Sequence, residues 1–263
     1  MIQIVVGFSV ATLIAVGAYG ARALSLSGAF ATVIVGTLTF GWGGLTPAVL
    51  LVLFFVSSTA LTRYRRGRKT SLSPGFSKGG RRDYGQVFAN GILAAVCSFM
   101  YGVQGNEIWL AGIVGALAAV TADTWGTELG VLSNRTPRLL TTGAHVPPGT
   151  SGGVTFPGSA AGFAGAGLIG LATASLELNA LWLIVGGLAG MLGMFLDSLL
   201  GATIQVMYYC PHCEVHTEQH PQHRCGTQTS RVRGISWVNN DVVNLLASSM
   251  GALSAIVLWS LTP

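Results

Sequence analysis

Eight long apolar runs constrain this sequence more than any other feature. A helix needs roughly 20 consecutive apolar residues to cross a bilayer core about 30 Å thick. The expected spans are approximately 2–20, 23–43, 45–62, 86–103, 108–132, 158–176, 180–207 and 237–261. Only 9% of the residues are charged, against roughly 25% in an ordinary soluble domain. We therefore expect an all-α, polytopic transmembrane helical bundle that forms a single membrane domain over residues 1–263.

The basic residues predict the orientation of this bundle. All fourteen Lys and Arg residues fall in the connections that follow the first, third, fifth and seventh spans, whereas the charged residues of the opposite connections are Glu107 and Glu177. Basic connections face the cytoplasm in membrane proteins. We expect a multi-pass protein of the cell membrane with both termini outside and the functional loops in the cytoplasm. The lipid bilayer is then the expected partner of the basic surface, and no nucleic acid is expected.

Small residues are regularly spaced in two of the spans. Gly158, Gly162, Ala166 and Gly170 recur every fourth residue, and Gly186, Gly190, Gly193, Asp197 and Gly201 lie along one face of another helix. Small side chains let helix backbones approach closely in lipid. We expect both faces to pack against neighbouring helices, and they also offer a route to an oligomer.

Four acidic residues lie inside the expected spans. They are Asp123, Glu128, Asp197 and Asp241. An ionised side chain costs about 2.5–3.5 kcal/mol at the centre of a span, so such residues are candidates for function. All four fall in the cytoplasmic half, whereas a transporter normally places its site near the midplane with access from both faces. Acids and amides from three helices suit Mg²⁺; the alternative is a set of hydrogen bonds between protonated acids and amides.

Helix geometry restricts how these groups can meet. Asp123 and Glu128 are five residues apart, about 140° around an ideal helix, so they can face one ligand only if the helix distorts. Asn240 and Asp241 each share a helix face with Asn244. We therefore expect the amides of the last span to contribute beside the acids.

Two cytoplasmic segments are candidates for phosphate binding. The loop Gly149, Thr150, Ser151, Gly152 and Gly153 leads into a helix, and exposed N–H groups beside a helix N-terminus attract phosphate. The basic residues Lys78, Arg81 and Arg82 precede the fourth span. Neither signal is specific, because the loop lacks the Walker A spacing and can be a flexible connection. The basic run can also serve only topology and attraction to anionic lipid.

The last cytoplasmic connection, about 208–236, carries an insert with cysteine and histidine residues. Cys210-Pro-His-Cys213 is followed by His223-Arg-Cys225, a spacing typical of a closed tetrahedral Zn²⁺ site. We expect Cys210, Cys213, His223 and Cys225 as ligands of a structural Zn²⁺. Free thiols or a redox role are the alternatives, and the reducing cytosol disfavours disulfides.

Four motifs, taken together, resemble one family of integral membrane proteins. They are Ala122-Asp-Thr-Trp-Gly-Thr-Glu-Leu-Gly130, Val146-Pro-Pro-Gly-Thr-Ser-Gly-Gly-Val154, Asp197-Ser-Leu-Leu-Gly-Ala202 with Gln205, and Asn239-Asn-Asp-Val-Val-Asn244. The family includes the plant phytyl-phosphate kinase of tocopherol biosynthesis and vertebrate transmembrane protein 19. The resemblance runs from about Leu24 to the C-terminus. It implies transfer of a phosphate from a nucleoside triphosphate, with CTP as the expected donor, to an isoprenyl monophosphate. Plant members have a shorter final cytoplasmic connection without the Cys and His ligands, so zinc is not expected to be shared chemistry.

These observations combine into one functional hypothesis, an isoprenyl-phosphate kinase. Asp123, Asp197 and Asp241 would hold Mg²⁺, and Glu128 and Asn240 would orient the ligands. The glycine-rich loop, the three basic residues and Asn244 would bind the nucleotide, while the isoprenyl tail would lie among the glycine-packed helices. A cytidylyl transferase acting on a lipid phosphate and a membrane transporter are the competing hypotheses.

Overall fold

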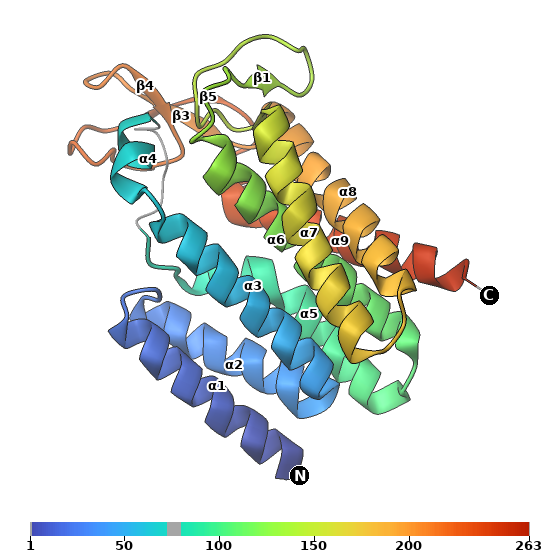
Figure 1. The fold of residues 1–263 in the computed structure, drawn as a ribbon. Coiled ribbons are helices and arrows are strands. Elements are labelled where there is room, and N and C mark those ends of the chain that lie inside the picture. Colours follow the sequence, from blue (N-terminus) through green and yellow to red (C-terminus); the bar gives the residue numbers. More distant parts are fainter. Residues whose placement is uncertain (1, 73–79, 263) are drawn as a thin grey trace.

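The computed structural model describes residues 2–72 and 80–262 and has a helical bundle with small strands gathered at one end (Figure 1). Within these residues, eight helices are long and apolar enough to cross a membrane, which confirms the predicted class. They are α1 (Ile2–Gly20), α2 (Leu26–Gly43), α3 (Leu45–Arg63), α5 (Tyr84–Gln104), α6 (Glu107–Gly130), α7 (Phe156–Leu176), α8 (Leu181–Thr203) and α9 (Asn240–Ser260). A short helix, α4 (Arg66–Leu72), follows α3.

Capping side chains explain why several spans start later than their apolar runs. α2 begins after Ser25, whose side chain accepts a hydrogen bond from the backbone N–H of Gly28. α9 begins after Asn239, whose side chain accepts from the N–H of Val242. Such caps satisfy N–H groups that have no partner within the helix. The seventh span was expected to continue to residue 207, but α8 ends at Thr203 because a strand starts at Met207.

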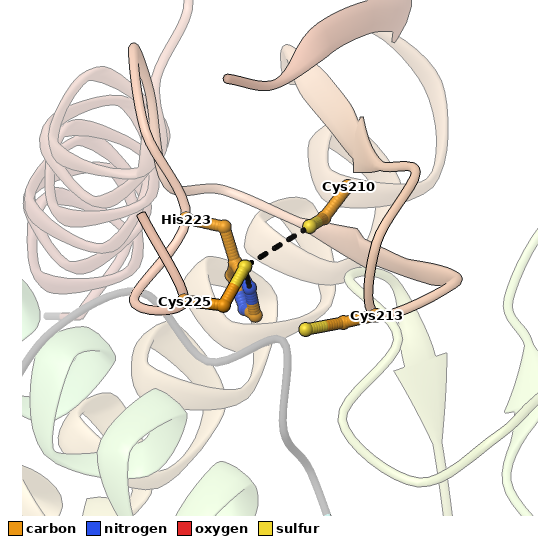
Figure 2. Close-up of side chains that lie close together, drawn as sticks. All are labelled: Cys210, Cys213, His223 and Cys225. Carbon is orange, nitrogen blue, oxygen red and sulfur yellow. Dashed lines mark hydrogen bonds between the residues drawn. The ribbon is translucent and has the colours of Figure 1, made fainter. Parts of the chain in front are cut away.

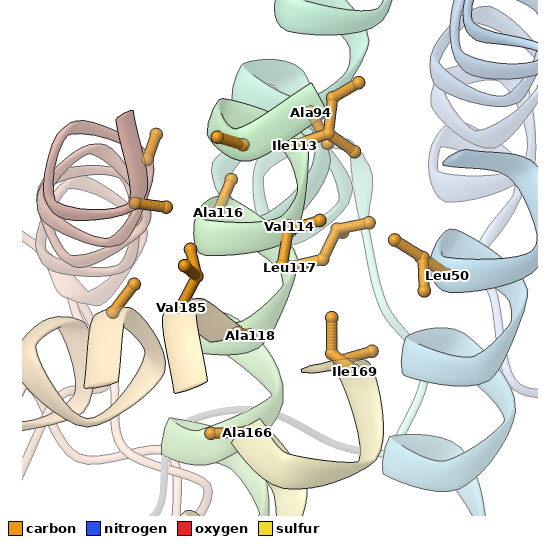
Figure 3. Packing of buried hydrophobic residues seen from close by; sticks show 14 of the residues in the cluster. Leu50, Ala94, Ile113, Val114, Ala116, Leu117, Ala118, Ala166, Ile169 and Val185 are labelled. Atoms are coloured by element: carbon orange, nitrogen blue, oxygen red, sulfur yellow. The ribbon is translucent and has the colours of Figure 1, made fainter. Parts of the chain in front are cut away.

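Helix α6 occupies the centre of the bundle. Every residue from Leu110 to Ala122 is buried, and Figure 3 shows its side chains meeting Leu50 of α3, Ala94 of α5, Ile169 of α7 and Val185 of α8. A helix that is apolar on all sides in this way must be surrounded by other helices. Between Ile108 and Ala122 this helix carries no ionisable side chain.

The glycine-rich faces of α7 and α8 are filled within the chain. A Cβ atom added at Gly190 would lie 2.5 Å from the Cβ of Ala166, and one added at Gly193 would lie 2.3 Å from the Cβ of Ala119. The expected close packing is present. The same contacts fill the surfaces that we had considered for an oligomer and for the isoprenyl tail. We therefore expect an oligomer interface and a site for the tail in other parts of the molecule.

The strands belong to the connections that carry the basic residues. β1 (Arg138–Leu139) pairs with β2 (Gly153–Val154) on either side of the loop before α7. β3 (Met207–Cys210) lies between β4 (Val215–Thr217) and β5 (Ser230–Arg233) in an antiparallel sheet within the insert between α8 and α9. Figure 1 shows both sheets and α4 at the same end of the bundle. This end is the basic one, as the charge pattern predicted.

Candidate functional site

A polar cavity of about 270 Å³ opens at this basic end, between the helices and the connections above them. Its wall includes most of the residues that the sequence singled out: Arg82, Asp123, Glu128, Gly149, Thr150, Ser151, Gly152, Gly153, Asp197, Asn240 and Asn244. They come from separate helices and from the glycine-rich loop. We call this space the polar cavity.

Two carboxyl groups meet at the polar cavity. Asp123 of α6 and Asp197 of α8 line it together and lie close enough for their side chains to interact. The Oδ2 atom of Asp197 is buried and has no hydrogen-bond partner among the described residues. A buried carboxylate oxygen of this kind requires a partner. A cation that prefers oxygen ligands, such as Mg²⁺ or Ca²⁺, fits this pair because it would balance two adjacent negative charges.

Glu128 also lines the polar cavity, but its carboxylate is already occupied. Its Oε2 accepts from the Nζ of Lys69 at 2.6 Å, and its Oε1 accepts from the hydroxyl of Thr62 at 2.6 Å. The polar cavity extends around the end of α6. Asp123 and Glu128 therefore both line it, although they lie on different sides of one continuous helix. We had expected Glu128 to orient ligands; its contacts instead connect α6 to α3 and α4.

Two of the predicted residues that the structure describes do not line this wall. Asp241 is one of them, and its Oδ2 lies where a Cβ added at Gly85 would approach it to 2.6 Å. Its side chain thus points toward the start of α5, and its role as a metal ligand beside Asp123 stays a prediction. Arg81 is exposed and is also absent from the wall. Lys78 lies outside the described residues.

Arg82 is the basic group that the structure brings to the polar cavity. Its guanidinium lies over the rings of Phe54 and Phe55, with its carbon 5.2 and 5.5 Å from the ring centres. Burial lowers the pKa of Arg82 to about 10, and the nearby charge of Glu128 opposes this shift. The side chain therefore stays cationic at neutral pH and offers a fixed positive charge to an anion.

The glycine-rich loop is attached to the end of α8. Gly149 and Gly152 have φ values of 80° and 82°, a region that favours glycine. A Cβ at Gly152 would also lie 2.5 Å from the Cβ and N atoms of Ala202. The hydroxyl of Ser151 donates to the side-chain oxygen of Gln205 at 2.7 Å. The loop thus has a defined shape beside the polar cavity.

Three outward-running helices begin at the polar cavity. Gln86 of α5, Ser159 of α7 and Asn240 of α9 all line it within the first turn of their helices. Helix N-termini carry a partial positive charge and attract anions. Carboxylates from α6 and α8 therefore face a ring of anion-attracting groups, an arrangement suited to a cation together with phosphate.

The sequence did not predict several residues of this wall. Glu218, in the insert just after β4, lines the polar cavity and accepts from the amide nitrogen of Gln205 at 2.8 Å. Only the fold brings this insert residue to the cavity. Gln86 and Asn90 also line it, and here a signal existed, because two amides four residues apart form a polar face on an otherwise apolar span.

A second cavity, of about 500 Å³, lies between α1, α2, α3 and α5. Its wall consists mainly of small and apolar side chains and extends along α1 from Gly7 to Ala18, a rise of about 17 Å along the helix. We call it the apolar cavity. Five residues line both cavities: Ala23, Thr59, Arg82, Gln86 and Asn90. The two spaces therefore adjoin at the basic end of the bundle.

The four predicted zinc ligands form a separate cluster in the insert (Figure 2). Ligand atoms of Cys210, Cys213, His223 and Cys225 all lie within 4.8 Å of one another. None of these thiols is in a disulfide. Hydrogen bonds from Thr227, with a further one from His223, lower the pKa of Cys225 to about 5. The hydrogen bond to Cys225 in turn raises the pKa of Cys213 to about 11.

Comparison with known proteins places the chain in a family. The family described as integral membrane protein DUF92 matches residues 9–252. Protein PGR of Arabidopsis thaliana is 32% identical, with 95% of each chain covered. The protein called VTE6, chloroplastic, of the same plant is 27% identical and covers 89% of this chain and 65% of its own length. An uncharacterized membrane protein of Methanocaldococcus jannaschii is 27% identical, with 98% of this chain and 95% of its own covered. No solved structure matches. The chain is a multi-pass member of the DUF92 family of integral membrane proteins.

Proposed function

We propose that this protein is a membrane isoprenyl-phosphate kinase, which transfers the terminal phosphate of a nucleoside triphosphate, with CTP as the expected donor, to an isoprenyl monophosphate. The observation that carries the proposal is the shared wall of the two cavities. An isoprenyl phosphate has a long apolar tail and a doubly charged head. The apolar cavity suits the tail, the polar cavity suits the head, and Arg82 lies where they adjoin.

The apolar cavity gives the tail a place within the protein. Its wall is built from helices that face the bilayer, and α1 exposes most of its outer surface. A tail that leaves the bilayer for this cavity exchanges one apolar environment for another, so little free energy is gained from the transfer itself. Selectivity for the tail then depends on the shape of the cavity, and affinity depends more on the phosphate head.

Phosphoryl transfer requires positioning and charge neutralisation more than covalent chemistry by the protein. Asp123 and Asp197 would hold Mg²⁺, which fits the buried, unpartnered oxygen of Asp197. When bound, the ion would neutralise charge on the nucleotide phosphates. Arg82, the loop Gly149–Gly153 and the starts of α5, α7 and α9 supply the remaining positive potential.

The reaction itself needs no general base from the protein. An oxygen of the isoprenyl phosphate is already an anion, and it attacks the γ-phosphorus of the nucleotide. The bond from that phosphorus to the bridging oxygen breaks, and the products are an isoprenyl diphosphate and a nucleoside diphosphate. The chain therefore has to hold two anions close together, which is the task for which the cationic groups of the polar cavity are placed.

Family membership supports the reaction class. The sequence resembles the family of the plant phytyl-phosphate kinase, and the chain aligns with the chloroplastic protein VTE6 over 89% of its length. The positive-inside pattern supports a cytosolic position for the polar cavity. We propose the cell membrane as the location, so that nucleotide would reach the site from the cytosol.

Product analysis tests this proposal. Purified protein in detergent is given geranylgeranyl or phytyl monophosphate, CTP labelled at the γ-phosphate, and Mg²⁺. We expect label in a lipid diphosphate, and we expect Asp123→Asn to abolish that product. Glu107→Gln, in an outer connection, is the matched control and should leave the rate unchanged.

The other functions give different outcomes in the same assay. A cytidylyl transferase would release the label as pyrophosphate and would leave cytidine monophosphate on the lipid. The absence of turnover with any nucleotide or isoprenyl phosphate would contradict the kinase and would favour transport. Retained kinase activity in Asp123→Asn would contradict the assignment of that residue to the metal.

A further inference from the structure

We propose that Cys210, Cys213, His223 and Cys225 bind one structural Zn²⁺ ion, and that this ion holds the insert 207–233 in place against the polar cavity. The four residues come from two turns. Cys210 ends β3 and Cys213 lies in the turn that leads to β4, while His223 and Cys225 lie in a second turn closed by the pairing of Gln222 with Gln228. Two turns that face each other with paired ligands are a suitable frame for one tetrahedral ion (Figure 2).

The distances between the ligand atoms match a tetrahedral zinc site. Zn–S bonds of about 2.3 Å at tetrahedral angles place two sulfur atoms about 3.8 Å apart, and a nitrogen ligand slightly closer. The Sγ atoms of Cys210 and Cys225 are 3.5 Å apart, and the Nδ1 of His223 lies 3.4 Å from the Sγ of Cys225. Three cysteines and one histidine fill all four positions, so the site is closed and structural.

His223 is buried beside the thiols, with its side chain only 2% exposed. Its Nδ1 faces the Sγ of Cys225 at 3.4 Å, so Nδ1 is the nitrogen placed to bind the ion. A disulfide between Cys210 and Cys225 would leave Cys213 and His223 without a role, whereas one Zn²⁺ accounts for all four residues.

The size of the insert is a second reason for a metal. Its sheet spans residues 207–233, and all four residues of β5 are at least partly exposed. A chain segment this short buries too little apolar surface to fold by itself, and small units below about 40 residues usually need a metal or disulfides. Since no described cysteine is in a disulfide, zinc would supply the missing stability.

The insert contacts the polar cavity through a chain of side chains. Glu218 follows β4 and accepts from Gln205, which in turn accepts from Ser151 of the glycine-rich loop. Arg233, at the end of β5, donates to the carbonyl oxygens of Gly201 and Ala202 at 2.8 and 2.6 Å. Loss of the ion should therefore loosen the loop as well as the insert.

Metal content tests the first half of the proposal. The full-length protein is purified in detergent through a tag that does not bind metals, and its zinc is measured by mass spectrometry. We expect about one zinc per chain, lost in Cys210→Ser, Cys213→Ser, His223→Ala and Cys225→Ser. Cys97→Ala, a thiol inside α5, and His216→Ala, an exposed histidine of the same insert, are the controls and should keep it.

Cobalt provides a second readout that does not depend on activity. Co²⁺ added to the metal-depleted protein should give the absorption bands of tetrahedral thiolate coordination, and Cys225→Ser should remove them. Protein that contains no zinc and gives no such bands would overturn the site. Zinc that survives in all four ligand variants would overturn the choice of ligands.

Hydrogen exchange tests the positioning role, which concerns the cavity of the proposed function but does not require kinase activity. Removal of zinc by a chelator should increase exchange in 207–217 and also in 149–153, and should leave the outer connection 177–180 unchanged. Faster exchange confined to the insert would overturn the positioning role and leave the zinc site standing. A kinase assay that fails would leave both measurements interpretable.

Discussion

The polar cavity and the apolar cavity adjoin in one protein, yet they are built in different ways. The polar cavity lies where helices begin and end, so caps, connections and inserted residues all contribute to it. The apolar cavity lies along the middle of α1, α2, α3 and α5 and is lined largely by small side chains. Helix ends provide charge and hydrogen-bonding groups, whereas helix middles can provide only shape. The comparison suggests that the polar cavity decides chemistry and the apolar cavity decides which lipid is accepted.

The largest expected effect comes from the carboxyl pair of the polar cavity. Asp197→Asn should lower the rate of phosphate transfer by more than about 100-fold, because even residues that only support metal ligands typically contribute 10- to 100-fold. The rate is measured with Mg²⁺ at saturating nucleotide. Asp241→Asn is the informative control, since Asp241 does not line the polar cavity, and it should cost much less. Equal losses of the transfer rate in both variants would assign Asp241 to the metal site as well.

Arg82 connects the two cavities, and its replacement should give the next largest effect. Arg82→Gln should raise the KM for isoprenyl phosphate about 10- to 100-fold, since a hydrogen bond to a charged group contributes about 1.5–3 kcal/mol. If Arg82→Gln weakened the binding of a neutral isoprenyl alcohol, used as a competitive inhibitor, by the same factor, the result would contradict a role for the charge of Arg82.

The charge of Arg82 predicts how the affinity for the isoprenyl phosphate depends on pH. Burial lowers the pKa of Arg82 to about 10, so the cation is fully present below that pH and is lost as the pH rises through it. Affinity for the phosphate should hold from pH 7 to 9 and fall above. Arg82→Lys starts from an ordinary pKa near 10.4, which the same burial lowers, so its decline should begin at lower pH. If the affinity for the phosphate depended on pH in the same way in the wild-type protein and in Arg82→Lys, the result would contradict this role of the Arg82 charge.

The apolar cavity should affect chain length and not chemistry. Gly17 lines it, and a Cβ there would meet no atom within 4 Å, so Gly17→Phe places a ring in the cavity without a clash. Affinity for a long isoprenyl phosphate should fall about 10-fold, because forcing a ring and the tail into one space costs about 1–3 kcal/mol, while a short-chain substrate should be unaffected. Gly167→Phe on α7, also without near neighbours and outside both cavities, should change neither. Equal effects on both chain lengths would contradict the tail assignment.

The smallest effect on catalysis should come from Glu128, although it lines the polar cavity. Glu128→Gln leaves Lys69 without its carboxylate partner, and the loss of a partner from a partly buried polar group costs about 1–3 kcal/mol of folding stability. Thermal unfolding in detergent measures this cost, and Lys69→Met combined with Glu128→Gln should recover part of it. A loss of turnover as large as that of Asp197→Asn would assign Glu128 to the chemistry.

The sequence predicted well where the physical signal is local. The eight spans follow from the length and hydropathy of each apolar run, and the structure confirms them. The basic connections follow from charge alone. The four zinc ligands lie within sixteen residues, so their spacing limits how they can meet, and the structure brings them together. Asp123 and Asp197 were singled out because an acid inside a span is costly wherever it lies.

The sequence alone could not place residues whose position depends on helix packing. Asp241 and Asn240 are adjacent, yet only Asn240 lines the polar cavity, because the rotation of α9 selects one of them. Glu128 lines the polar cavity but meets Lys69, which lies 59 residues earlier in the chain. The glycine faces were correctly expected to pack closely, but that packing leaves no room for a lipid tail there.

The sequence by itself determined the membrane class, the acids inside the spans and the Cys and His cluster of the insert, because each depends on composition or on spacing within one segment. Only the tertiary structure decided that two cavities exist, that they share Arg82, and that Glu218 of the insert reaches the polar cavity. The reason is physical. A cavity is the space left when several helices pack, and its lining depends on their rotation and separation, which no single segment of the chain encodes.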